Sequence, residues 1–146
     1  MPADWIRDLK EHKSKKQKKL IIERALIAYR LGSSSAENFL YTCYLAYNPL
    51  FIYGVEPDDV IVTQGIKDQA NPWSKFWGVI EMLRTHSLNK AKLLMIVNIE
   101  TAPLFNSREW NTVCRPVILK DLHCGINEKL LNCVLGNSEW RIPELE

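Results

Sequence analysis

Apolar residues recur at helical spacing along most of this 146-residue chain, and this period constrains its fold more than any other feature. The clearest run follows Asn71-Pro72 and obeys the i, i+3, i+4 rule: Trp73, Phe76, Trp77, Ile80 and Leu83. Residues that commonly begin or end helices separate the runs, such as Ser14 before one run and Gly32 after it. The sequence therefore predicts an all-α fold, a compact bundle of about seven helices.

The expected helices cover residues 3–12, Ser14 to Gly32, Ser33-Ser34-Ser35 to Asn48-Pro49, Trp73 to Leu83, a run through Lys92, Leu93, Ile96 and Val97, Asn106-Ser107 to Leu122, and about Asn127 to Leu135. Residues 50–70 differ. Phe51–Val55 and Val60–Thr63 are β-branched and aromatic, and the Glu56–Asp59 stretch between them is typical of a turn. This segment forms either a small hairpin or an irregular loop, and we favour the loop.

The cysteines and the apolar runs restrict the class of protein. Of the four cysteines, only Cys124 and Cys133 are near each other, and neither forms a zinc-like pattern with a histidine. We expect free thiols, which fit a reducing cytoplasm. No apolar run approaches the roughly 20 residues that a membrane span needs, so we expect a soluble protein with no membrane partner.

Catalytic patterns are missing from the sequence. It contains no Gly-rich phosphate loop, no HExxH and no GxSxG. The acids of Glu56–Asp59 offer oxygen ligands, but a solvated turn is the favoured interpretation. We therefore expect no catalytic residue, no metal site and no cofactor in this chain.

Three connections between expected helices carry lysines, small polar residues and helix-opening amides. A helix start favours anions because of its dipole, so lysines placed there are explained if a phosphate binds. Gly125 also permits a positive φ and a close approach by a ligand. The candidate DNA-binding residues are Ser14, Lys15, Lys16 and Lys18; Ser87, Asn89 and Lys90; and Lys120, Gly125, Asn127 and Lys129. The alternative for each lysine is a solvent-facing side chain.

Several stretches of the chain resemble one protein family. They are Trp5-Ile6-Arg7-Asp8-Leu9 through Ser14–Lys18, Tyr44–Pro49, the turn Lys120-Asp121-Leu122-His123-Cys124-Gly125, Asn132 with Val134, and Ile142-Pro143. Together they resemble the N-terminal domain of ATP-dependent DNA ligases of T-even-type bacteriophages. Cys133 departs from the family, which usually has lysine there, and Lys129 is the residue that could replace that contact.

The resemblance implies a DNA-binding domain at residues 1–139, followed by a linker at residues 140–146 towards a nucleotidyltransferase domain that this sequence does not contain. Such a domain binds nicked duplex DNA along the minor groove without reading sequence, and helps the catalytic domains encircle it during replication and repair. ATP and Mg²⁺ would serve the parent enzyme, in the cytoplasm of a phage-infected host.

Two other functions remain open at this stage. The first is a helical protein-interaction module whose exposed aromatic residues, such as Trp140, dock a replication partner such as a sliding clamp. The second is a small enzyme whose site follows no familiar pattern.

Overall fold

The predicted helical runs form helices in the computed structural model, which describes residues 1–64 and 70–144. The elements are α1 (Pro2–Glu11), α2 (Lys15–Arg30), α3 (Ser34–Tyr47), the 3₁₀ turn η1 (Pro57–Asp59), α4 (Trp73–Thr85), α5 (Lys90–Met95) with its π-helical continuation η2 (Ile96–Thr101) and the 3₁₀ turn η3 (Ala102–Leu104), α6 (Ser107–Glu109), the π-helical η4 (Trp110–Cys114), α7 (Arg115–Ile118) and α8 (Glu128–Leu135). The elements α6, η4 and α7 follow one another directly and are counted as one helix. With α5 and η2 also counted as one, the described part has seven helices and no strand, which confirms the all-α prediction.

Polar caps begin the helices where the sequence predicted them. The Ser14 hydroxyl accepts a hydrogen bond from the Gln17 amide at 3.1 Å, and Ser33 accepts one from the Ala36 amide. Each cap satisfies one of the amide groups that a helix start leaves without an intrahelical partner. Asn89, Asn106 and Asn127 cap α5, α6 and α8 in the same way.

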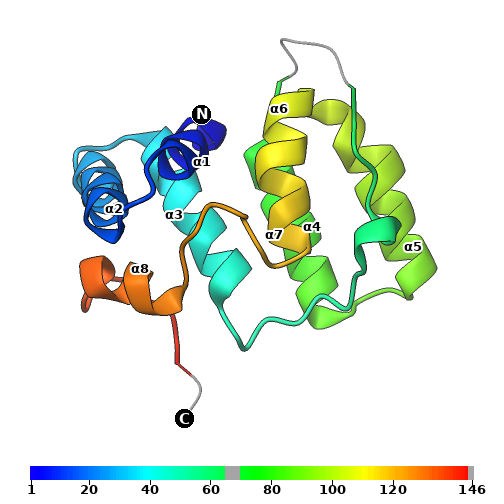
Figure 1. Cartoon of the computed structure of the whole chain (residues 1–146). Coiled ribbons are helices and arrows are strands. Elements are labelled where there is room, and N and C mark those ends of the chain that lie inside the picture. Colours follow the sequence, from blue (N-terminus) through cyan, green and yellow to red (C-terminus); the bar gives the residue numbers. More distant parts are fainter. Residues whose placement is uncertain (65–69, 145–146) are drawn as a thin grey trace.

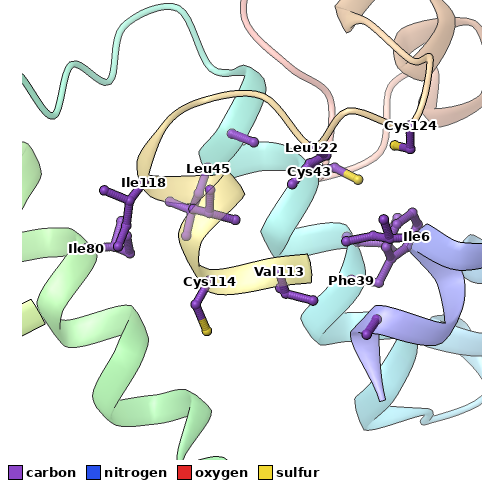
Figure 2. Packing of buried hydrophobic residues seen from close by; sticks show 14 of the residues in the cluster. Ile6, Phe39, Cys43, Leu45, Ile80, Val113, Cys114, Ile118, Leu122 and Cys124 are labelled. Carbon is purple, nitrogen blue, oxygen red and sulfur yellow. The ribbon is translucent and has the colours of Figure 1, made fainter. Parts of the chain in front are cut away.

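The helices form two neighbouring groups (Figure 1). In this view α1, α2, α3 and α8 lie on the left, and α4, α5, α6 and α7 lie on the right. The groups meet where α3 packs against α7 and α1 packs against η4. Figure 2 shows buried side chains at this junction, among them Ile6 of α1, Phe39 of α3 and Ile118 of α7, each at most 1% exposed. One hydrophobic core therefore fixes both groups.

The described part of residues 50–70 is irregular, as favoured, and side-chain amides hold it in place. Asn98 accepts a hydrogen bond from the Ile61 amide and donates one to the Asp59 carbonyl, at 3.0 and 2.8 Å. Asn111 accepts from the Thr63 amide and donates to the Thr63 carbonyl, at 2.9 and 2.7 Å. These two asparagines satisfy backbone groups that a partner strand would satisfy in a hairpin. Residues 65–69 lie outside the described part.

The expected helix from Asn106 to Leu122 is too long by several residues. The helix ends at Ile118, and Lys120 has a left-handed backbone with φ of 63°. Leu122 is still fully buried, but it belongs to the turn that follows. Its apolar character reflects burial of that turn rather than a further helical repeat.

The described part of the predicted linker, residues 140–144, contacts the helical domain. The backbone of Ile142 donates to the Asn132 side chain at 2.8 Å and accepts from it at 2.9 Å. The Ile142 side chain is fully buried. Trp140 packs edge-on against Tyr29 and Tyr41, with ring centroids 5.4 and 6.0 Å apart, and is partly buried rather than fully exposed. These contacts attach the segment to the domain.

Candidate nucleic-acid interface

Two of the three predicted connections meet at Lys18 of α2. The Lys18 ammonium donates to the Leu9 carbonyl near the end of α1 at 2.8 Å, and to the Cys124 carbonyl at 2.6 Å. The side chain is only 7% exposed. Lys18 therefore holds the α1–α2 connection against the turn before α8, and its charge faces the interior rather than a ligand.

Gly125 has the positive φ that the sequence predicted, at 73°. The close approach that it permits is internal. A Cβ atom at this position would lie 2.8 Å from the Lys18 Nζ atom. The glycine thus makes room for the lysine that holds the turn, which is a sufficient reason for it even without a phosphate.

Lys120 is likewise engaged inside the protein. Its ammonium donates to the carbonyls of Asn48 and Phe51, the second at 2.5 Å, and it lies 5.4 Å from the centre of the Tyr53 ring. Burial lowers the pKa of the Lys120 ammonium. Lys120 ties the turn to the segment after α3 and is partly buried, whereas Lys18 is buried.

Helical spacing carried a signal that distinguishes Lys18 from its neighbours in the lysine run. Lys18 falls three, four and seven residues before Ile21, Ile22 and Ala25, all of which are buried. It therefore belongs to the inward face of α2. Lys10 and Lys13, which the candidate set omitted, are exposed beside the same connection.

Five of the remaining candidates lie at the starts of α2 and α8. Ser14, Lys15 and Lys16 are exposed where α2 begins, and Asn127 and Lys129 are exposed where α8 begins. Asn127 caps α8 by accepting from the Leu130 amide at 2.9 Å. None of these lysines forms an ion pair with a residue that the structure describes. We call these five residues the basic helix-start surface.

The third connection does not join this surface. Figure 1 places the link between α4 and α5 at the lower right, far from the starts of α2 and α8. Lys90 there forms an ion pair with Asp59 at 3.2 Å, and Asn89 caps α5. Ser87 is exposed, and its amide donates to the Met82 carbonyl. The structure thus brings together two of the three predicted contacts.

Two further groups bear on chemistry. In the described ranges, no set of three or more His, Cys, Asp or Glu side chains could hold a metal ion. The four cysteines are free thiols, of which Cys43, Cys114 and Cys124 are buried and Cys133 is exposed.

No helix in residues 1–64 or 70–144 has both the length and the apolar character that crossing a membrane requires.

Comparison with known proteins gives matches in structure only. No protein-family profile and no curated protein sequence matches the chain. Two solved structures do. The one named Pmar-Lig_PreS3 has a TM-score of 0.81 and 25% identity over 98% of this chain. Pmar-Lig_Pre has a TM-score of 0.79 and 25% identity over 97%.

Both names place the fold in a ligase context. This chain spans only 31% of the length of either matched chain. The similarity therefore supports a ligase-associated domain. It does not extend to the activity of the longer proteins.

Proposed function

We propose that this chain is the DNA-binding domain of an ATP-dependent DNA ligase of the T-even bacteriophage type. In this proposal it holds the phosphate backbone of nicked duplex DNA along the minor groove, without reading bases. The observation that carries the proposal is the basic helix-start surface, in which Lys18 holds together two helix starts whose lysines have no ion-pair partner among residues 1–64 and 70–144. The ligase-named structural neighbours supply the context.

The chemistry of this surface suits a polyanion. Lys15, Lys16 and Lys129 supply positive charge, and the starts of α2 and α8 add the positive ends of two helix dipoles. Phosphate contacts of this kind fix the position of a protein on a duplex but carry no sequence information. The parent enzyme would supply ATP, Mg²⁺ and the nucleotidyltransferase chemistry for strand sealing in replication and repair, in the cytoplasm of the infected host.

The test compares two charge-removing variants of equal size. Lys15→Gln/Lys129→Gln removes one lysine from each helix start, and Lys75→Gln/Lys92→Gln removes two exposed lysines from α4 and α5. Binding to a fluorescein-labelled nicked duplex, and to the same duplex without a nick, is measured by anisotropy across a salt series. Because each neutralised phosphate adds about 0.9 to the slope of log affinity against log salt, the first variant lowers the slope by about 1.8.

The control variant keeps the slope of the unmodified chain. Equal losses in both variants would mean that the chain attracts DNA only through its general charge. Binding that is unaffected by the loss of Lys15 and Lys129 would overturn the assignment of the surface.

A further inference from the structure

Helix α2 and its C-cap residue Leu31 carry a second apolar face that stays exposed in the described part of the chain. Leu20, Ile27 and Leu31 lie at positions i, i+7 and i+11, which share one side of a helix. Their exposed fractions are 44%, 49% and 83%. The opposite side of α2 is already buried in the core through Ile21, Ile22, Ala25 and Leu26. The outward stripe is thus surplus to the packing of the domain.

Ile27, the middle residue of this stripe, also lines a groove between α2 and α8. The groove has a volume of about 790 Å³, and its apolar lining includes Leu26 and Ile27 of α2 and Val134 of α8. Cys133 of α8 also lines it and is exposed. Helices α2 and α8 pack against each other along this groove. It therefore has the form of a shallow trough between two packed helices.

The groove is bordered mainly by positive charge. Lys19 and Arg30 line it, Arg24 lies on the same exposed side of α2, and Glu23 is the acid among the lining residues. The three cations form no ion pair with any residue in the described ranges. An occupant with carboxylates beside an apolar stripe would complement this pattern.

We propose that the groove between α2 and α8 binds an amphipathic helix of another protein, with apolar residues along one side and Asp or Glu on its flanks. A helix laid in a groove makes contacts every three to four residues, and the stripe from Leu20 to Leu31 is about three turns long. A second copy of this chain fits poorly, because a symmetric dimer would set its cations against each other. Nucleic acid fits poorly as well, because phosphates gain nothing from exposed aliphatic groups.

The probes are three synthetic peptides of about 18 residues, a length that spans the stripe with margin. The first has a leucine stripe flanked by glutamates, the second has the same stripe flanked by lysines, and the third is a scrambled form of the first with equal charge and no stripe. Each carries fluorescein, and the full chain is added while anisotropy is recorded. We expect saturable binding of the first peptide alone, at least tenfold tighter than either other peptide.

Variants then locate the binding. Ile27→Gln/Leu31→Gln weakens the first peptide at least tenfold, whereas Ile99→Gln, at an exposed isoleucine of η2, leaves its affinity unchanged. Lys15→Gln/Lys129→Gln also leaves it within twofold, which separates this groove from the proposed DNA surface. Equal binding of the scrambled peptide, or no saturation below about 1 mM, would overturn the proposal. So would a loss of duplex affinity, instead of peptide affinity, in Ile27→Gln/Leu31→Gln.

Discussion

Replacing Lys18 with methionine removes an ammonium group that donates to two backbone carbonyls while keeping most of the side-chain length. The Leu9 and Cys124 carbonyls then lose their donor at 2.8 and 2.6 Å, in a site that is 7% exposed at Lys18. Hydrogen bonds to charged groups contribute about 1.5–3 kcal/mol each, and a buried acceptor without a donor costs about 1–3 kcal/mol. Methionine recovers part of the lost stability through apolar contacts, because its flexible side chain fills irregular gaps in a core.

The free energy of unfolding is therefore expected to fall by about 3 kcal/mol in Lys18→Met. For a domain of this size, that corresponds to a loss of roughly 6–12 °C in Tm. Urea unfolding followed by tryptophan fluorescence measures the first quantity, because Trp110 is fully buried in the core. Thermal unfolding measures the second.

Lys19→Met is the matched control, because Lys19 is the next residue of α2 and is exposed. Surface substitutions of this kind change stability by about 0.5 kcal/mol or less. Amide hydrogen exchange should also become faster near Cys124 in Lys18→Met and stay unchanged in Lys19→Met. Equal stability of the two variants would refute the internal role of Lys18.

Three other substitutions test separate parts of the account. Gly125→Ala should destabilise the fold by about 1–2 kcal/mol, because alanine is strained at a φ of 73° and its Cβ would lie 2.8 Å from the Lys18 ammonium; urea unfolding measures this, and a change below 0.5 kcal/mol would contradict it. Asn132→Leu should remove both hydrogen bonds to the Ile142 backbone and make the segment after α8 more sensitive to limited proteolysis; unchanged cleavage there would show that these bonds do not hold the segment. Burial raises the pKa of Glu109, so the contribution of this carboxyl group to stability is present below its unfolded pKa, near 4.5, and is lost as pH rises through its folded pKa. The free energy of unfolding of the unmodified chain, relative to that of Glu109→Gln, should therefore fall as pH rises from about 4. A difference between the two that urea unfolding shows to be independent of pH would contradict this.

The helices could be predicted because their signals are local. The spacing of Trp73, Phe76 and Ile80 records one buried face, and caps such as Ser14 and Asn106 mark helix starts within a few residues. The end of the helix before Leu122 was misplaced, because burial of a turn produces the same apolar signal as another helical repeat. Turn chemistry favoured an irregular form for residues 50–64, but the sequence did not predict the side-chain hydrogen bonds of Asn98 and Asn111 that hold this segment in place.

Long-range polar contacts explain what the sequence could not provide. Asn98, Asn111 and Asn132 each pair with backbone that is ten to fifty residues away, and nothing in their sequence neighbourhood indicates it. The candidate site was affected in the same way. Their place in connections beside expected helix starts put Lys18 and Lys120 among the candidate phosphate-binding residues, whereas the fold uses both ammonium groups to satisfy backbone carbonyls.

The most direct test of the central claim is the footprint of a nicked duplex on the backbone amides of the chain, measured by NMR chemical-shift changes during a titration. The account predicts the largest changes at residues 13–17 and 125–129, which begin α2 and α8, and small changes at residues 85–92. Changes concentrated between α4 and α5, or no saturable change at all, would contradict it.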